Sequence, residues 1–333
     1  MSFMRSEASE APEAIACFLD HNKTALHALG RRLRSMDPPV VLTSARGSSD
    51  NAAGYLKYLT EIALGVPCAS VGASVASLYG ASLRVRNGLS VTISQSGKSP
   101  DIVALQEAAR TSGALTVAIV NVDDSPAAKS ADICLPLCAG PEQSVAATKT
   151  FIVSLVASAA IVAEWKGDAA LSKAIAELPE QLARARELEW SSFIETTARA
   201  ESLYVLGRGP SFPIASETAL KLKETCAIHA EAYSAAEVMH GPLELVEAGF
   251  PVLVYAQDDV ARPATEAAVA RLKSMGAAVA VAGGDLPVIA ADHPLLAPIP
   301  MIQTAYLAIE TLAQTLGRNP DKPRQLKKVT ETV

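Results

Sequence analysis

The 333-residue sequence has few cysteines, and they form no recognisable framework. The five are Cys17, Cys68, Cys134, Cys138 and Cys226. An odd number of scattered cysteines is typical of buried thiols in a reducing compartment rather than of disulfides. Cys134 and Cys138 are close in sequence, but residues 133–137 form a strand-like run and no second cysteine pair follows. We therefore expect no metal site at these cysteines.

Basic clusters and long apolar segments are also missing from the sequence. The formal net charge is −6 and the basic residues form no block, which argues against nucleic acid and anionic membranes as partners. The longest apolar stretch, residues 151–163, is well short of the ~20 residues that a bilayer span requires, so it predicts a buried helix. The N-terminal residues contain no apolar region typical of a secretory signal. These features predict a cytoplasmic protein.

The composition and the hydrophobic pattern indicate an α/β protein. Half of the residues are hydrophobic and 19% are charged, which fits a globular enzyme with a large core and room for two domains. The predicted strands are residues 40–42, 89–93, 115–120 and 133–137, and the predicted helices are residues 51–64, 101–111 and 146–165. Strand–helix alternation of this kind predicts a parallel sheet with helices on both faces, which binds ligands at the carboxyl ends of its strands.

The pattern occurs twice along the chain. Arg46-Gly47 follows the first apolar run, and Arg208-Gly209 follows a later one. The number of residues from Gly113 to Gly276 is nearly the same as the number from Gly47 to Gly209. Two motifs that repeat at nearly the same spacing predict a duplicated domain. Between the halves, residues 169–200 are charged and helical in pattern, with one break at Pro179. This segment predicts a helical connector rather than a flexible linker.

Two hydroxyl-rich loops follow predicted strands of the first half. The loop 94–99 (SQSGKS) precedes a predicted helix and combines three hydroxyls, an amide and a glycine at a helix N-terminus, where unpaired N–H groups favour an anion. The alternative is a plain polar turn in which Ser99 caps the helix. Gly47-Ser48-Ser49 follows the first strand and should reach the same sheet edge. Together the loops predict a sugar-phosphate pocket.

The second half offers a different set of polar residues. Glu217, Lys221 and Glu224 have the spacing of one helix face, which is usually a solvated stripe with an i,i+4 ion pair. His240 precedes Gly-Pro at a predicted sharp turn, where a histidine can equally be a capping or packed loop residue. Catalysis by this Glu/Lys/His set is the alternative interpretation.

The chain resembles the isomerase half of glucosamine-6-phosphate synthase and its relatives, including the SIS-type glucosamine-6-phosphate deaminases. The resemblance extends from about Glu10 to the C-terminus. The matching motifs are RGSS at 46–49, SQSG at 94–97, VAATK at 145–149, ALKLKE at 219–224, HAEAY at 229–233, HGP at 240–242 and PRQLKK at 323–328.

The resemblance implies a role for each matching residue. The phosphate is held by Ser94, Gln95, Ser96 and Ser99, sugar hydroxyls by Ser48 and Ser49, and further substrate contacts come from Val145 and Ala147. Glu224 is the base that moves a proton between carbons 1 and 2. Lys221 assists at the sugar oxygens, with Glu217 beside it. His240 opens the ring from the partner subunit of a homodimer, and Lys328 matches a lysine that forms a Schiff base with the ketose.

The resemblance also implies two tandem flavodoxin-like, three-layer αβα SIS domains with parallel sheets. The boundaries that we expect are 1–29 for an N-terminal helical segment, 30–165 for the first domain, 166–196 for the connector and 197–333 for the second domain. Ala147 departs from the pattern, because the synthase has a serine there and one sugar contact is lost. The chain begins near the isomerase region, so we expect no glutamine-dependent activity.

The expected reaction converts glucosamine 6-phosphate and water into fructose 6-phosphate and ammonia, with no cofactor and no metal. The alternatives are a plain phosphosugar isomerase and an ammonia-dependent synthase that lacks a glutaminase. A sugar-phosphate sensor is a further alternative of another class, because SIS domains also occur in regulators. A sensor needs the phosphate loop but not the Glu217, Lys221, Glu224, His240 and Lys328 set, so these residues favour an enzyme.

Overall fold

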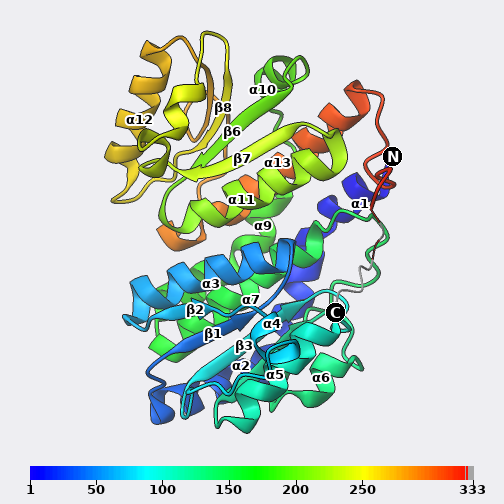
Figure 1. The fold of residues 1–333 in the computed structure, drawn as a ribbon, viewed down its shortest axis with the longest axis vertical. Helices are drawn as coiled ribbons and strands as arrows, with labels where there is room; N and C mark the ends of the chain where they lie inside the picture. The colour runs from blue at the N-terminus through cyan, green and yellow to red at the C-terminus, as the bar shows by residue number, and fades with distance from the viewer. Residues whose placement is uncertain (327, 329–333) are drawn as a thin grey trace. The chain divides into compact units, whose positions relative to one another are not determined.

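Two parallel β-sheets organise the chain, one in each of two structural units (Figure 1). The computed structural model describes residues 1–326 and 328. The first-sheet unit comprises Glu13–Glu142 and Lys149–Ala176. The second-sheet unit comprises Met1–Pro12, Gln143–Thr148 and Glu177–Lys328. The chain therefore crosses between the units more than once, and residues 143–148 belong with the second sheet although they precede a helix of the first-sheet unit.

The first sheet has five parallel strands in the order β2-β1-β3-β4-β5. In chain order these are β1 (Val41–Ser44), β2 (Cys68–Ser70), β3 (Leu89–Ser94), β4 (Leu115–Val120) and β5 (Ile133–Pro136). All six residues of β4 are buried, as expected for a parallel strand whose two faces are both covered by helices. This order is the flavodoxin-like arrangement that the sequence predicts.

Helices cover both faces of the first sheet. Those of this unit are α2 (Ala11–Met36, whose first two residues belong to the other unit), α3 (Ser48–Leu64), α4 (Ser74–Ser77), α5 (Pro100–Thr111), α6 (Pro126–Ser130), α7 (Lys149–Lys166) and α8 (Ala169–Ala176). Helices α3 and α7 pack together, whereas α5 packs with α4 and α6. Figure 1 shows these two helix groups on opposite faces of the sheet.

The second sheet has four parallel strands in the order β7-β6-β8-β9. These are β6 (Ser202–Gly207), β7 (His229–Ser234), β8 (Pro251–Tyr255) and β9 (Ala278–Ala282). The helices are α1 (Phe3–Ser9), α9 (Leu178–Ala185), α10 (Ser191–Thr197), α11 (Phe212–Lys221), α12 (Arg262–Ser274) and α13 (Pro298–Thr315). Val252 and Val254 of β8 pack in one cluster with Leu272 of α12. Tyr255 points to the other face, where its hydroxyl lies 2.6 Å from Thr218 Oγ1 of α11.

The repeat that the sequence predicts is present in the backbone. Gly47 and Gly209 follow β1 and β6 with φ of 55° and 58°. Gly113 and Gly276 precede β4 and β9 with φ of 88° and 85°. Because a side chain makes this left-handed region unfavourable, the two pairs mark equivalent turns of two copies of one αβα domain.

Two helices begin elsewhere than the sequence pattern predicts. Helix α3 begins at Ser48 rather than 51, because Gly47 turns the chain directly into the helix. Helix α7 begins at Lys149 rather than 146, where Glu142 accepts hydrogen bonds from Thr150 N at 3.2 Å and from Thr150 Oγ1 at 2.9 Å. A carboxylate at these first-turn N–H groups fixes the start of the helix. The predicted connector is three helices, and Pro179 lies in the first turn of the second.

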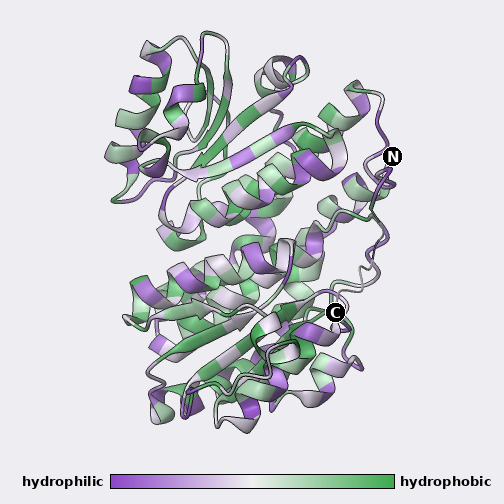
Figure 2. Ribbon diagram, in the orientation of Figure 1, coloured by the Kyte–Doolittle hydropathy of each residue, from purple (hydrophilic) through white to green (hydrophobic). Residues whose placement is uncertain are grey.

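The predicted buried helix at 151–163 is confirmed, because α7 is buried over almost its whole length. Figure 2 shows hydrophobic residues along this helix and the strands. One described helical stretch, Pro294–Thr315, is long and apolar enough to cross a membrane, but 83% of its apolar window is buried inside the protein. The expectation of buried thiols holds for Cys68 and Cys226 and is wrong for Cys17, which is exposed.

Candidate active site

The two hydroxyl-rich loops of the first-sheet unit lie at one edge of its sheet. Ser44, the last residue of β1, pairs with Thr92 of β3, so both strands end on the same side. Arg46 Nη2 then forms an ion pair of 2.6 Å with Asp101 Oδ2, in the first turn of α5. Asp101 is only 3% exposed. This bond links the 46–49 loop to the helix that follows the 94–99 loop.

The loop 94–99 folds on its own hydroxyls. Ser94 Oγ accepts a hydrogen bond from Gly97 N at 3.0 Å, and Ser96 Oγ accepts one from Lys98 N at 3.4 Å. Gly97 has φ of 61°, and a Cβ there would lie 2.2 Å from Ser125 Oγ. Only glycine fits this backbone. Ser99 occupies the N-cap position of α5, but its side chain makes no capping bond, so the simple capping interpretation is wrong for its hydroxyl.

Helix N-termini add to the polarity of this sheet edge. Ser48 and Ser49 are half-buried and lie in the first turn of α3, not in the loop before it. Helix α5 starts directly after the 94–99 loop. First-turn N–H groups lack partners within a helix, and the helix dipole places partial positive charge there. Hydroxyls and N–H groups at two such N-termini are suited to hold a phosphate.

A buried charge cluster occupies the second-sheet unit. Lys221 Nζ lies 3.4 Å from Glu217 Oε1 and 2.5 Å from Glu224 Oε2. Tyr306 of α13 donates its hydroxyl to Glu217 Oε1 at 2.9 Å. The side chains of Lys221 and Glu217 are 1% and 0% exposed, and that of Glu224 is 21% exposed. The predicted i,i+4 ion pair is present, but the interpretation as a solvated stripe is wrong.

The surroundings of Lys221 decide its protonation. Burial by itself lowers the pKa of Lys221, but the carboxylates of Glu217 and Glu224 outweigh it, so the pKa lies above its ordinary value. Lys221 is therefore an ammonium group at neutral pH. An ammonium group can orient a carboxylate and donate to an oxygen, but it cannot attack a carbonyl.

Glu224 lies in an irregular turn that sequence reasoning missed. After α11 the chain forms a π-helical turn, Leu222–Cys226, which ends at Ala227 with φ of 52°. Such turns are rare and frequently occur at functional sites. Here the turn presents Glu224 on a cavity of about 680 Å³ while Lys221 stays buried. Nothing in the local sequence signals it, because Ala227 stands where a glycine would mark the helix end.

Lys328 and the segment 143–148 meet in the second-sheet unit. Lys328 Nζ donates to Ser144 O at 2.7 Å, and Val145 N donates to Asp321 O at 3.4 Å. Val145 and Ala147 are half-buried beside these contacts. The structure thus brings Lys328 to the distant segment that contains Val145 and Ala147, two other sequence-predicted site residues.

The N-terminal helix α1 holds this group in place, which sequence reasoning also missed. The carboxylate of Glu7, 4% exposed, accepts hydrogen bonds from Gln143 N and from Ser144 N, the latter at 3.2 Å. The carboxylate of Asp321 accepts from Phe3 N and from Met4 N, each at 2.8 Å. Helix α1 therefore ties the 143–148 segment and the C-terminal tail together.

Replacing Glu7 should weaken the second-sheet unit. Glu7→Ala leaves the buried N–H of Ser144 and the partly buried N–H of Gln143 without this acceptor, which costs about 2–3 kcal/mol of unfolding free energy. Glu10→Ala, at the exposed C-cap of the same helix, should cost less than about 0.5 kcal/mol. Urea unfolding of both variants measures the difference. Equal stability of the two would show that Glu7 does not anchor this segment.

His240 lies apart from the charge cluster. It follows the short helix Glu237–Met239, is exposed, and precedes Gly241 with φ of 135°. Among the described residues, no hydrogen bond or ion pair joins its side chain to Glu217, Lys221 or Glu224.

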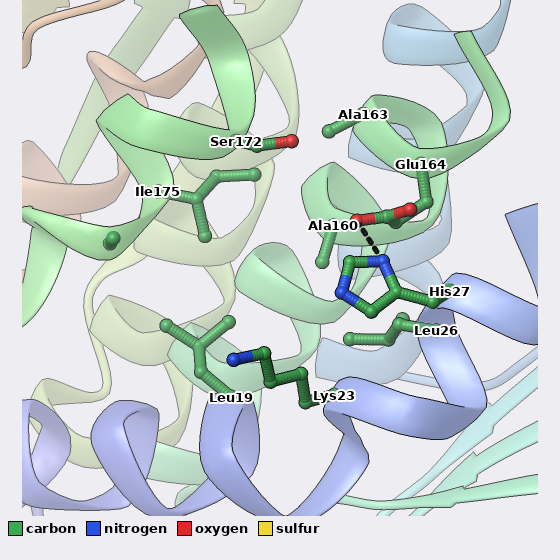
Figure 3. Close-up of a pocket in the computed structure, with 10 residues that line it drawn as sticks. Leu19, Lys23, Leu26, His27, Ala160, Ala163, Glu164, Ser172 and Ile175 are labelled. Atoms are coloured by element: carbon green, nitrogen blue, oxygen red, sulfur yellow. Dashed lines mark ion pairs between the residues drawn. The ribbon is translucent and has the colours of Figure 1, made fainter. Parts of the chain in front are cut away.

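A separate cavity of about 220 Å³ lies in the first-sheet unit, between α2, α7 and α8. Figure 3 shows His27 of α2 beside Glu164 of α7, with Nδ1 2.9 Å from Glu164 Oε1. Leu19 and Ile175 belong to the apolar part of the lining. None of the sequence-predicted site residues lines this cavity, so it is not part of the candidate active site.

The SIS domain model matches this chain over residues 38–163 and 197–310. The chain belongs to the SIS domain family. Each matched segment contains one of the two parallel sheets described above. Among the described residues, no cluster of potential metal ligands is found.

Individual relatives agree with this assignment. A candidate phosphosugar isomerase from Silicibacter pomeroyi DSS-3 is 43% identical, with a TM-score of 0.93, over 96% of this chain and 100% of its own. A glutamine–fructose-6-phosphate aminotransferase from Zymomonas mobilis is 32% identical over 98% of this chain and 58% of its own length. The chain thus spans a little over half the length of such relatives. Glucosamine-6-phosphate deaminase from Thermotoga maritima, 22% identical with a TM-score of 0.81, shares the fold.

Proposed function

We propose that this SIS protein is a phosphosugar isomerase that deaminates an amino-sugar 6-phosphate, most simply glucosamine 6-phosphate. The observation that supports it best is Glu224, a carboxylate held by the buried ammonium group of Lys221 and presented on a cavity. A sugar-phosphate sensor has no use for such a base. Relatives named for fructose 6-phosphate chemistry and for phosphosugar isomerisation support the same substrate class.

The proposed reaction needs only proton transfers and water. In the open-chain sugar, Glu224 removes the proton from carbon 2 and returns it to carbon 1. This converts the 2-amino aldehyde into a ketimine at carbon 2. Water adds to the ketimine carbon, the carbon–nitrogen bond breaks, and fructose 6-phosphate and ammonia leave. Lys221 keeps Glu224 oriented, and its positive charge favours the negative charge that develops on the sugar oxygen. Hydroxyls of the 94–99 loop hold the phosphate.

Ser96→Ala should raise KM far more than it lowers kcat. The loop is proposed to bind the phosphate equally well in the ground state and in the transition state, so its loss affects KM and not kcat. Loss of one hydrogen bond to the charged phosphate should raise KM about tenfold to hundredfold. Steady-state kinetics with glucosamine 6-phosphate measure this. Comparable turnover of unphosphorylated glucosamine would contradict the phosphate role.

His240 is proposed to open the sugar ring in the active site of the partner subunit of a homodimer. Its exposure supports this role, as does the lack of a hydrogen bond or ion pair from its side chain to the charge cluster among the described residues. Mixing inactive Glu224→Gln protein with inactive His240→Ala protein should then restore about a quarter of wild-type activity in hybrid dimers that have one intact site. No recovery after verified subunit exchange would place His240 outside a shared site.

A panel of substrates tests the proposed function directly. The purified protein should release ammonia and fructose 6-phosphate in equal amounts from glucosamine 6-phosphate. Isomerisation of glucose 6-phosphate without ammonia release from any amino sugar would instead favour a plain isomerase. Glutamine-supported formation of glucosamine 6-phosphate would contradict the proposed direction.

A further inference from the structure

One oxygen of the buried carboxylate of Glu217 faces two donors. Tyr306 of α13 donates its hydroxyl to Glu217 Oε1 at 2.9 Å, and Lys221 Nζ lies 3.4 Å from the same oxygen. A second contact of this ammonium group is closer, because Lys221 Nζ lies 2.5 Å from Glu224 Oε2. Lys221 is therefore held off-centre between the two carboxylates, nearer to the one that is presented on the cavity.

Burial makes this division of the ammonium group matter. Tyr306 and Glu217 are 0% exposed, and Lys221 is 1% exposed. Water screens charges and hydrogen bonds only weakly in such surroundings. A carboxylate oxygen that accepts a hydrogen bond from a hydroxyl shares its negative charge with that donor, so it attracts an ammonium group less strongly. The hydroxyl of Tyr306 therefore favours the contact of Lys221 with Glu224 over its contact with Glu217.

Helix α13 also contacts the π-helical turn that carries Glu224. Cys226, the last residue of that turn, donates its thiol to Ile309 O at 3.6 Å. Ile309 follows Tyr306 by about one helical turn, so one short stretch of α13 contacts both Glu217 and the turn. Tyr306 is not among the described residues that line the cavity. It is therefore placed to act on Glu224 rather than on a ligand in that cavity.

We propose that Tyr306 is a positioning residue for the base Glu224, to which it is linked through Glu217 and Lys221. Its hydroxyl occupies Glu217 Oε1, which keeps the ammonium group of Lys221 on Glu224. Without this hydroxyl, Glu217 draws Lys221 towards itself, and Glu224 loses the donor that orients it. The inference rests on the proposed function, because Glu224 is the proposed base.

Tyr306→Phe tests this role, because phenylalanine keeps the buried ring and removes only the hydroxyl. The kcat for glucosamine 6-phosphate should fall about threefold to tenfold, the effect of one hydrogen bond, and KM should stay within about twofold of the wild-type value. Tyr255→Phe is the matched control. Tyr255 is also fully buried, and its hydroxyl lies 2.6 Å from Thr218 Oγ1 on α11. This control should keep the wild-type kcat, and an equal fall in both variants would overturn the inference.

A double variant tests whether Tyr306 acts through Glu217. Glu217→Gln removes the charge that would draw Lys221 away from Glu224. Adding Tyr306→Phe to Glu217→Gln should then change kcat by less than about twofold. If Tyr306→Phe lowers kcat by the same factor with and without Glu217→Gln, Tyr306 does not act through Glu217 and the inference is overturned.

An NMR measurement without substrate separates this inference from the proposed function. The carboxyl carbon signal of Glu224, assigned by its absence from Glu224→Gln protein, depends on the hydrogen bond from Lys221. Tyr306→Phe should move this signal, and Tyr255→Phe should leave it in place. An unmoved signal in Tyr306→Phe overturns the inference even if the wild type deaminates glucosamine 6-phosphate. A signal that moves only in Tyr306→Phe supports it even if the substrate is another phosphosugar.

Discussion

Glu224→Gln should lower kcat for glucosamine 6-phosphate by a factor of about 10²–10⁴ and leave KM within a few-fold of the wild-type value. The amide keeps the size of the side chain and can still contact Lys221, but it cannot accept a proton from carbon 2. The loss should therefore appear in the chemical step alone. Steady-state kinetics and a binding measurement with the same substrate separate the two effects.

A matched control makes this result specific. Glu247→Gln changes one exposed glutamate in the same unit, and its kcat should equal that of the wild type. If Glu224→Gln retains more than about a tenth of wild-type kcat, another group is the base. The side chain of Glu224 is partly exposed, so unfolding of this variant is not expected, and a thermal melt checks this.

Lys221→Met should destabilise the protein by about 3–5 kcal/mol, because it removes the buried ammonium group that pairs with the buried carboxylate of Glu217. The hydroxyl of Tyr306 would still donate to this carboxylate. The double variant Glu217→Gln/Lys221→Met removes both buried charges and should recover much of the loss. Urea unfolding of the two single variants and the double variant gives the coupling energy. If the loss of unfolding free energy in the double variant equals the sum of the losses in the two single variants, the two side chains are not energetically coupled.

The same cluster predicts how stability depends on pH. The pKa of Lys221 is raised above its ordinary value of 10.5, so the folded state binds this proton more tightly than the unfolded state. The stabilisation is complete below about pH 10.5 and is lost as the pH rises through the higher folded pKa. Wild-type protein should therefore lose stability above this pH, and the double variant should lose less.

The sequence predicts four of the five strands of the first sheet because their signals are local, and it misses the short β2, Cys68–Ser70. Residues 115–120 form an unbroken apolar run and become β4 with the predicted ends. Gly113 and Gly276 mark equivalent turns because only glycine accepts their backbone without strain. The Arg46 and 94–99 loops were also predicted to meet, since parallel strands place their carboxyl ends on one edge.

Other features of the candidate site depend on contacts between distant segments. Glu7 contacts residues 143 and 144, and Asp321 caps α1 at Phe3 and Met4. No periodicity or spacing in the sequence signals such pairs. The burial of Glu217 and Lys221 could not be predicted either, because the same spacing usually describes a solvated helix face. Their burial depends on α13, whose Tyr306 reaches Glu217.

The π-helical turn at Leu222–Cys226 has a similar origin. Ala227 adopts a left-handed conformation as the chain turns from α11 into β7, and Ile228 N donates to Leu222 O at 3.3 Å. A residue with a Cβ enters this region only when its surroundings compensate the strain. The position of Glu224 on the cavity is therefore a property of the packed unit and not of its local sequence.

Hydrogen transfer between carbons 1 and 2 is the central claim, and NMR in D₂O tests it most directly. Glucosamine 6-phosphate incubated with the wild-type protein should give fructose 6-phosphate that carries deuterium at carbon 1, because a proton held by Glu224 exchanges with solvent before it returns. The Glu224→Gln variant should form no such product at a comparable rate. Absence of any ketose phosphate, or ketose whose carbon 1 contains no solvent deuterium, would contradict the account.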